Sequence, residues 1–446
     1  MAEIAVSATE TALENQRIGT LQIRVVALCT AIQMCDGYDI GAIGWAVPPL
    51  THAWNMPGPA FTFAFALSNV GILVGALVAG PLGDRLGRRP LLLVSTALFG
   101  VASLLTAFAT SLPILALLRL FTGLGIAGAF AGTVALTGDY TPARRRALMI
   151  MVIFTGAPLG GFVGGQIVAL MLHLGYGWQS IFMLGGLFPL GMLPILAGWL
   201  PESPRFLARK SGLSPRQKAL LARLDIVPDA SSAGLDIAAG NPVRMLFGEG
   251  YAVQTVLMWI IFFCSLLNLF LFVFWMPEVL HLMGMTPATA VFASSLRELG
   301  AILAVLYLGV AIDRYGPERS LAANYAVGAI FIALIALVAL PYAILLVTIF
   351  LSGMTIIGSQ TGANAACGKL YPARMRASGI GWALGIGRLG GIVAPILGGY
   401  LLKAGWVPTH IFLVACVFAI VAAVATALLG PAMARVAANT PDEVSP

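Results

Sequence analysis

Between two long apolar segments, residues 80–90 read GPLGDRLGRRP, a short turn that carries four charged side chains. The flanking apolar segments lie near 60–82 and 90–109. Each is close to the roughly 20 residues that an α-helix needs to cross the hydrocarbon core of a bilayer. A charged turn between two such segments predicts a pair of antiparallel membrane-spanning helices.

The same alternation of apolar segments and short polar turns continues along the chain of 446 residues, of which 59% are hydrophobic and 10% charged. Soluble domains carry roughly 25% charged residues, so this composition excludes a soluble protein. A helix is expected for every span, because an open strand would leave backbone groups unpaired in lipid. Apolar stretches of spanning length lie near 24–50, 60–82, 90–109, 114–139, 148–172, 178–200, 253–280, 287–312, 319–340, 343–370, 377–402 and 406–429. The sequence thus predicts an all-α polytopic membrane protein with about 12 transmembrane helices.

The basic residues predict the orientation of these helices. Of the 25 Lys and Arg residues, Lys403 alone falls on one side, Arg119, Arg297 and Arg388 fall within spans, and all others fall on the opposite side. Positive loops face the cytoplasm, so we expect cytoplasmic termini and an inner-membrane location. The same asymmetry explains the net charge of +7 without a nucleic-acid partner.

The longest polar stretch separates six predicted spans from six. The expected organisation is a cytoplasmic N-terminal segment, a six-helix bundle, a cytoplasmic linker, a second six-helix bundle and a cytoplasmic tail, at 1–23, 24–200, 201–252, 253–430 and 431–446.

The two halves resemble each other at an offset near 230 residues. Three pairs of matching segments occur in the same order: Gly83–Arg89 with Asp313–Gly316, Tyr140–Arg144 with Tyr371–Arg374, and Leu159–Gly161 with Leu389–Gly391. Parallel repeats of six helices are typical of secondary transporters. The repeat therefore predicts two pseudo-symmetric six-helix bundles, and a transporter rather than an enzyme.

Three motifs carry a resemblance to a known superfamily. GPLGDRLGRRP at 80–90 is similar to the signature between the second and third helices of the major facilitator superfamily. RLFTGLG at 119–125 resembles its fourth-helix motif, and PESPR at 201–205 resembles its motif at the end of the sixth helix. The resemblance covers nearly the whole chain.

A narrower resemblance, to the aromatic acid:proton symporter family, rests on DGYD at 36–39 and on the segment from Tyr371 to Gly390. It implies a proton-coupled importer of a hydroxybenzoate or benzoate, with the proton as coupling ion and no other cofactor. The fourth span departs from the family, since GAFAGT at 128–133 lacks its usual Pro and Asn. The alternatives are a proton-coupled exporter of drugs or metabolites, and a symporter of a non-aromatic acid such as a dicarboxylate.

Asp36 and Asp39 lie near the middle of the first span, three residues apart and hence on one helix face. Carboxylates that close resist ionising together, so we expect one of them to bind the transported proton, with Asp39 slightly favoured. Alternatively, both are structural and cap a break in the helix or pair with an arginine. The stretch around Asn268 in the seventh span has no acid, which assigns proton chemistry to the N-terminal half.

Three arginines within spans are candidates for binding a substrate anion. Arg388, beside Gly387 and Gly390, can hold a carboxylate through two parallel hydrogen bonds, or form a permanent salt bridge. Arg119 can attract the anion, neutralise the two acids, or serve as a structural bridge. Arg297 and Glu298 need not pair, because neighbours on a helix point about 100° apart; they join the polar network or indicate another substrate.

Polar and aromatic side chains within spans complete the expected substrate site. They are Tyr38, Asn268, Gln360, Asn364 and Trp382. Amides within a span usually serve a cavity. The five cysteines and four histidines show no metal-type spacing; we expect buried cysteines, interfacial histidines and no metal site.

The resemblance implies a conformational latch at the cytoplasmic edge. Its residues are Gly83, Asp84, Arg85, Arg88 and Asp139, with Asp313 and Arg314 in the second half. Arg88 is expected to bridge to Asp139, and Asp84 to lie at the positive N-terminus of the eleventh helix. The expected partners are a small aromatic carboxylate, protons and lipid, and the expected state is a monomer.

Overall fold

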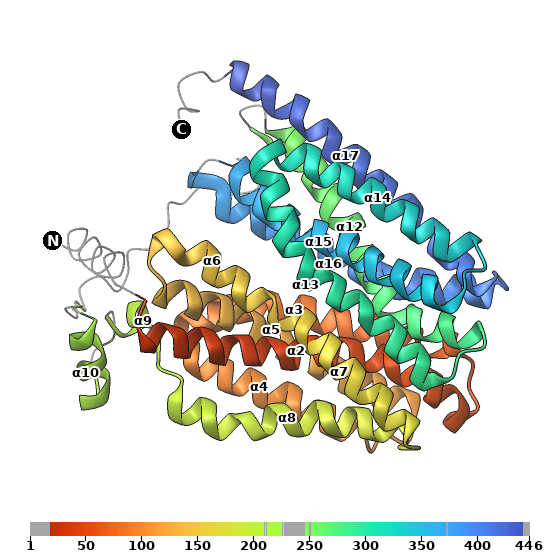
Figure 1. The fold of residues 1–446 in the computed structure, drawn as a ribbon. Coiled ribbons are helices and arrows are strands. Elements are labelled where there is room, and N and C mark those ends of the chain that lie inside the picture. The colour runs from red at the N-terminus through yellow and green to blue at the C-terminus, as the bar shows by residue number, and fades with distance from the viewer. Residues whose placement is uncertain are drawn as a thin grey trace. The chain divides into compact units, whose positions relative to one another are not determined.

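Helices joined by short turns make up the computed structural model (Figure 1). The structure describes residues 18–208, 210, 212–224, 226, 246–248, 251–371 and 373–439.

Eleven segments of the described part are long and apolar enough to cross a membrane. They are built from α3 (Thr62–Leu86), α4 (Arg88–Thr106), α5 (Leu112–Tyr140), the pair α6 (Ala143–Phe154) and α7 (Gly156–His173), α8 (Trp178–Trp199), α12 (Ala252–Leu282), α13 (Pro287–Tyr315), α14 (Pro317–Leu337), α15 (Tyr342–Leu370), α16 (Ala373–Lys403) and α17 (Ile411–Asn439). The long helix α2 (Thr20–Trp54) precedes them; it contains Asp36 and Asp39, which lower its hydropathy. The prediction of an all-helical polytopic membrane protein is confirmed.

Several helix ends differ from the predicted boundaries by a few residues, and the end of the last helix by more. α2 begins at Thr20, before the predicted start at 24, and α17 runs to Asn439, past the predicted end at 429. Hydropathy marks the part of a helix that lies in lipid, whereas backbone hydrogen bonds continue beyond it. In the polar stretch 201–252 the described residues form α9 (Pro204–Ala208) and α10 (Pro215–Arg223), which starts at a capping box of Ser214 and Gln217. The rest of this stretch lies largely outside the described residues.

The chain divides into two compact units. The first comprises 1–39, 70–160 and 179–238, and the second comprises 40–69, 161–178 and 239–446. Parts of α2, α3 and α7, which belong to the first half of the sequence, therefore group with the second half. The predicted division into two six-helix bundles at 24–200 and 253–430, which rests on the sequence pattern, stays a prediction.

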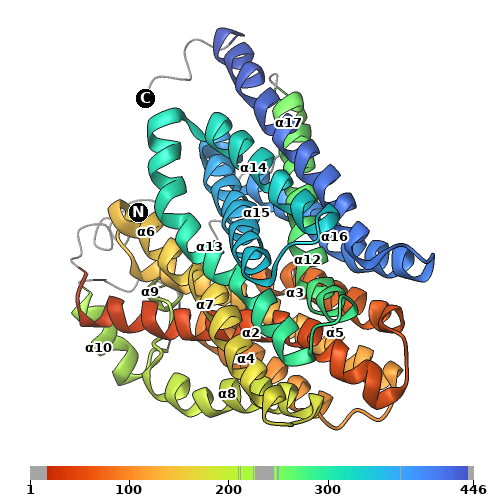
Figure 2. The ribbon, with the colours of Figure 1, turned by 45° about the vertical axis from the view of Figure 1, so that its right-hand side comes forward.

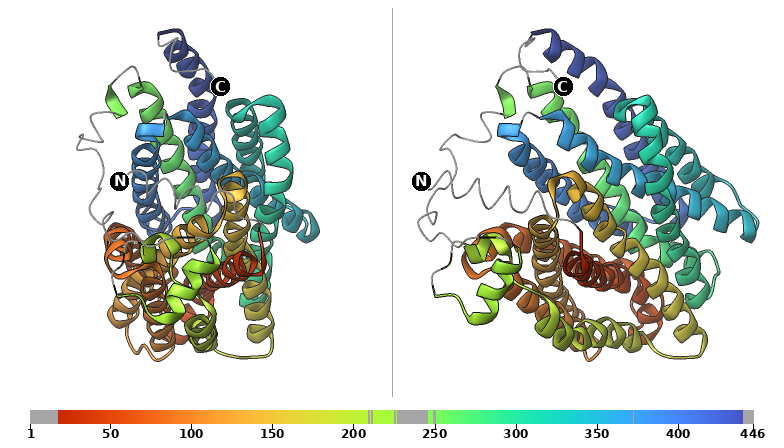
Figure 3. Two further views of the ribbon diagram at one scale, coloured as in Figure 1. Left: turned by 90° about the vertical axis from the view of Figure 1, so that its left-hand side faces the viewer. Right: turned by 60° about the vertical axis from the view of Figure 1, so that its left-hand side comes forward.

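Within the second unit, α12 packs against α16 and α17, α13 packs against α15, and α14 packs against α15 and α17 (Figure 1). The end of α7 lies beside α13, where Gln166 Nε2 donates to Ser295 Oγ at 2.6 Å (Figure 2). In the first unit α4 packs against α5. Two further views show the ribbons of both units (Figure 3).

The predicted internal repeat has structural counterparts at matching positions. Gly87 precedes α4 with φ +101°, and Gly316 precedes α14 with φ +84°. Both conformations favour glycine, since a Cβ there would be strained. Gly160 of α7 lies against the Met34 carbonyl of α2, and Gly390 of α16 lies against the Phe263 carbonyl of α12, so closely that neither position has space for a Cβ. Equivalent helices in the two halves thus meet through equivalent glycines.

Tyr140 and Tyr371, another predicted pair, both anchor the chain at a helix end. Tyr140 donates to the Glu202 carbonyl at 2.7 Å, and Tyr371 donates to Thr255 Oγ1 at 3.1 Å. Burial raises the pKa of Tyr371 to about 12, so its hydroxyl keeps the proton that it donates.

Candidate transport site

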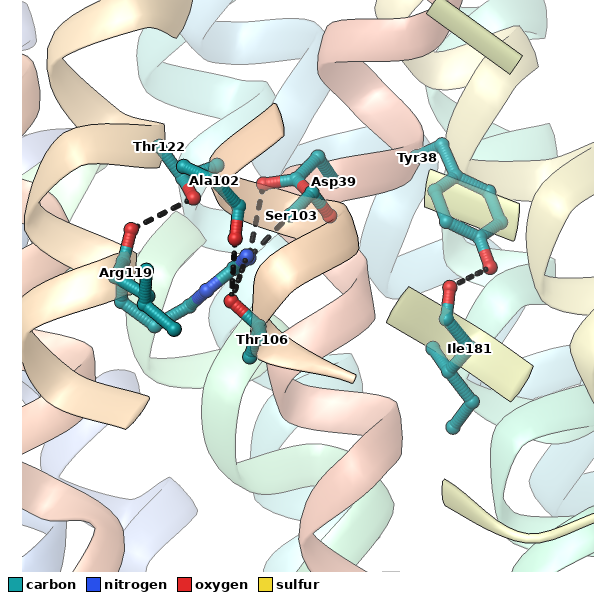
Figure 4. A network of polar contacts seen from close by, with 9 residues as sticks. Tyr38, Asp39, Ala102, Ser103, Thr106, Arg119, Thr122 and Ile181 are labelled. Atoms are coloured by element: carbon teal, nitrogen blue, oxygen red, sulfur yellow. Dashed lines mark hydrogen bonds and ion pairs between the residues drawn. The ribbon is translucent and has the colours of Figure 1, made fainter. Parts of the chain in front are cut away.

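A buried ion pair lies in the interior of the first unit. Arg119 of α5 donates through Nη1 to both carboxylate oxygens of Asp39 of α2, at 3.1 and 3.3 Å (Figure 4). The side chains are only 1% and 2% exposed. This ion pair fits two of the three roles considered for Arg119, namely neutralisation of Asp39 and a structural bridge.

Side chains of α4 and α8 complete the surroundings of this pair. Ser103 donates to Asp39 Oδ1 at 2.6 Å, and Arg119 Nη2 donates to Thr106 Oγ1 at 2.8 Å (Figure 4). The guanidinium carbon also lies 4.9 Å from the centre of the Phe182 ring, in cation–π geometry. Four helices therefore fix the pair, which offsets the cost of burying two charges.

Asp36 lies one turn earlier in α2 and is buried as well. Between the two acids, Gly37 contacts the backbone of Ala157 in α7 without space for a Cβ. This close contact of backbones fixes the segment that carries both carboxylates. Tyr38, the third residue of the motif, donates from its hydroxyl to the Ile181 carbonyl of α8 at 2.7 Å (Figure 4).

In the second unit, Arg388 lies at the middle of α16 and is half-buried. The neighbouring helix α15 carries Gln360 and Asn364, and Gln360 Nε2 donates to Asn364 Oδ1 at 3.5 Å. Gln360 Oε1 is buried and accepts no hydrogen bond from a described residue. An amide oxygen without a donor is the kind of group that a substrate hydroxyl can satisfy.

Asn268 fits its predicted place in the substrate site less well than Gln360 does. It is fully buried, and with its amide oriented for best hydrogen bonding it donates to the Ala415 carbonyl at 2.9 Å and accepts from the Ala419 amide at 3.2 Å. Both partners belong to the backbone of α17, so the side chain fastens α12 to α17. Trp382 is exposed, with its ring centre 6.0 Å from that of Trp259.

Arg297 and Glu298 of α13 pair directly, with Arg297 Nη2 2.5 Å from Glu298 Oε1. Adjacent positions on a helix need not pair, but these two do, because both side chains are long and flexible enough to reach each other. Arg297 Nη1 also donates to the Leu269 carbonyl of α12 at 3.3 Å.

Glu278 is an acid that the sequence analysis did not single out. It lies in α12 ten residues after Asn268, is 3% exposed, and its Oε2 has no hydrogen-bond partner among the described residues. A Cβ on Gly58 would lie 2.5 Å from its Oε1. The seventh span therefore holds an acid outside the stretch around Asn268, and the assignment of proton chemistry to the N-terminal half stays a prediction. An acid inside an apolar run was the available signal.

The latch residues of the first unit are paired differently from the prediction. Arg88 Nη2 lies 2.5 Å from Asp84 Oδ1. Asp139 instead accepts from Ser203 Oγ at 2.6 Å and lies 3.6 Å from Arg205 Nε. The predicted Arg88–Asp139 bridge is not formed in this structure, because each partner is closer to another group.

Glu202 connects the motifs at 80–90 and 201–205. Its Oε1 accepts from the backbone amides of Arg88 and Arg89 at 2.8 and 3.0 Å. These are the first amides of α4, which have no partner within the helix, and a carboxylate there also interacts favourably with the helix dipole. Sequence reasoning missed Glu202, Ser203 and Arg205 as members of this cluster, since their contacts are distant in sequence: Glu202 is 114 residues from Arg88, and Ser203 is 64 residues from Asp139.

The other latch residues make fewer contacts. Gly83 faces Arg88, whose Nη1 would lie 2.6 Å from a Cβ at that position. Arg85, Asp313 and Arg314 are exposed, and the Arg314 guanidinium lies 5.3 Å from the centre of the Tyr315 ring. The described residues contain no group of three His, Cys, Asp or Glu side chains that could hold a metal ion.

Comparisons with known proteins agree with this architecture. The model of the Major Facilitator Superfamily matches residues 29–290 and 258–445. A gallate transporter of Pseudomonas putida is 35% identical over 88% of this chain and 88% of its own length. A 4-hydroxybenzoate transporter of Acinetobacter baylyi is 31% identical, covering 93% of this chain and 92% of its own length.

Solved structures show the same fold at lower identity. The crystal structure of a D-xylose-proton symporter has a TM-score of 0.67 and 17% identity, covering 89% of this chain and 97% of that chain. A nucleoside transporter has a TM-score of 0.69 and 13% identity, covering 92% of this chain and 100% of that chain.

Proposed function

We propose that this chain, which belongs to the Major Facilitator Superfamily and is a membrane transporter, imports an aromatic carboxylate together with protons. The substrate class follows from the relatives, which include transporters of gallate, 4-hydroxybenzoate and benzoate. The proton coupling rests on one observation, the buried pair of Asp39 and Arg119.

Protonation of Asp39 and the ion pair exclude each other. A proton on the carboxyl group removes the charge that balances Arg119, and leaves the guanidinium for Thr106 alone or for an incoming anion. Asp36, on the same face of α2, supplies a second carboxyl group to hold or pass on the proton. We propose that one of these two acids carries the transported proton.

Arg388 is the arginine that we assign to the substrate carboxylate. Its guanidinium can form two parallel hydrogen bonds to a carboxylate, a geometry that lysine cannot reproduce. The unsatisfied Gln360 Oε1 on the adjacent helix α15 supplies an acceptor for a ring hydroxyl. This pair of groups suits a hydroxybenzoate better than an unsubstituted benzoate.

The test is uptake of labelled benzoates, hydroxybenzoates and a dicarboxylate into proteoliposomes, with and without a pH gradient. We expect hydroxybenzoates to accumulate only when the outside is acidic. Accumulation of the dicarboxylate alone, or proton-driven expulsion of hydrophobic drugs, would assign the chain to one of the alternatives. In the same assay Asp39→Asn should exchange substrate but not accumulate it, and Arg388→Lys should bind it as weakly as Arg388→Ala.

We also propose an inner-membrane location with cytoplasmic termini, and a monomeric state. The distribution of basic residues supports this orientation. A cysteine introduced as Asp225→Cys, outside the described residues, should react with an impermeant maleimide only in broken cells. Labelling in intact cells would reverse the topology.

A further inference from the structure

Two histidines meet at the ends of α2 and α12. His52 lies in the last turn of α2 and His281 in the last turn of α12, and both belong to the second compact unit. Their Nε2 atoms are 3.1 Å apart, with ring centres separated by 5.3 Å and ring planes at 76°. By sequence, α2 is the first span and α12 the seventh, so this contact links the two halves of the chain.

The hydrogen bonds of His281 fix its tautomer. Its Nδ1 lies 2.8 Å from the Met285 carbonyl oxygen, which can only accept, so Nδ1 carries the hydrogen. In the neutral ring Nε2 then presents a lone pair towards His52. His52 must therefore donate from Nε2 to form the observed contact. If the hydrogen of His52 moved to Nδ1, the lone pair of its Nε2 would also face the space between the two rings.

We propose that His52 and His281 together bind a divalent transition-metal ion such as Zn²⁺ or Ni²⁺. Zinc binds imidazole nitrogens at about 2.0–2.1 Å in tetrahedral geometry, which places two such nitrogens about 3.3 Å apart. The observed 3.1 Å requires the rings to separate by a few tenths of an ångström. On binding, the hydrogen on His52 Nε2 moves to Nδ1 through solvent, and both Nε2 lone pairs point to the metal.

The surroundings of the pair suit a metal ligand. A metal-bound histidine usually donates its other N–H to a carbonyl or carboxylate, which orients the ring; His281 already donates to Met285. His52 is exposed, so water can reach the ion. Because the described residues offer no third His, Cys, Asp or Glu here, water completes the coordination, and we expect moderate affinity.

A metal ion at this place would fasten α2 to α12. Alternating access requires the two halves to separate at each end in turn. In the topology proposed above, these helix ends are extracellular, so the bound ion holds the outer end closed. External zinc should therefore inhibit uptake by slowing reopening, without competing for the substrate carboxylate.

Binding is tested first on the purified full chain in detergent, by titration with ZnCl₂ and NiCl₂ in a buffer that does not chelate metals. We expect one site per chain, and a loss of affinity of about tenfold or more in His52→Ala, His281→Ala and His52→Gln. The chain has four histidines, so the double variant His173→Ala with His410→Ala is a matched control that should keep the site. Equal affinity in all variants, or no binding by the unsubstituted chain, would overturn the proposal.

Substrate exchange between proteoliposomes and buffer is the second measurement, because it needs no proton gradient and does not depend on the coupling proposal. External zinc should lower the exchange rate of the parent chain and of the His173/His410 control, and chelation should restore it. His52→Ala and His281→Ala should resist zinc. Inhibition of these variants at the same zinc concentration as the parent would show that the ion acts elsewhere.

Discussion

Two ion pairs inside the spans are built in contrasting ways. Asp39 and Arg119 are 80 residues apart and meet across α2 and α5, in surroundings supplied by α4 and α8. Arg297 and Glu298 are sequence neighbours on α13 and are less completely buried, with side chains 6% and 17% exposed. The first pair depends on the packing of four helices, whereas the second forms along one helix.

This contrast indicates which ion pairs are permanent parts of the structure and which can break and re-form. An ion pair that forms on one helix persists when neighbouring helices move, so its formation does not depend on their positions. A pair that joins two helices is made or broken by their motion and by protonation of its acid. The Asp39–Arg119 pair is therefore the better coupling element, and the following substitutions test that ranking.

The largest effect is expected for Arg119→Met. Removing one partner of a buried pair leaves the other charge unbalanced, which costs about 3–5 kcal/mol of stability. Equilibrium unfolding in mixed detergent micelles measures the loss, and adding Asp39→Asn should recover much of it. A loss as small as that of Lys403→Met, an exposed control, would show that the pair contributes little.

Glu278→Met should act in the opposite direction. The buried Oε2 has no hydrogen-bond partner among the described residues, so replacement by an apolar side chain of similar length removes a penalty of about 1–2 kcal/mol. We expect an unchanged or higher unfolding midpoint. A clear destabilisation would indicate that Glu278 has a partner in another conformation, and uptake by the same variant would show whether transport needs the acid.

Glu298→Gln should cost only about 1 kcal/mol, because the amide oxygen still accepts from Arg297, which also keeps its bond to Leu269. The comparison with Asp39→Asn is direct, since both changes replace a carboxylate by its amide. If Glu298→Gln abolished accumulation in a pH gradient while Asp39→Asn did not, the coupling role would pass to the pair on α13.

The smallest effect on stability is expected for Asp84→Asn. Asp84 and Arg88 are 67% and 23% exposed, and exposed pairs four residues apart contribute about 0.3–0.5 kcal/mol. Turnover should nevertheless fall strongly if the latch operates, with substrate affinity within a few-fold of the parent. Normal turnover in both Asp84→Asn and Arg88→Gln would remove the latch from this part of the chain.

Some parts of the site could be derived from sequence and others could not. Asp36, Asp39, Arg119 and Arg388 are conspicuous because a charge in an apolar run needs a reason to be there. Their partners could not be derived from the sequence, because the partner of each charge depends on which helices pack together. The same limit applies to Asn268, whose amide faces α17, and to Glu202, which caps α4 from another motif.

The sequence by itself determined the helical class, the approximate spans and the internal repeat, because hydropathy and turn residues act locally along the chain. It also carried the matching glycines, which tolerate backbone contacts wherever they occur. Only the tertiary structure decided that Arg119 pairs with Asp39, that Asp139 pairs with Arg205, and that His52 meets His281. Such contacts depend on the rotation and depth of each helix against its neighbours, and close packing of side chains from distant segments sets both.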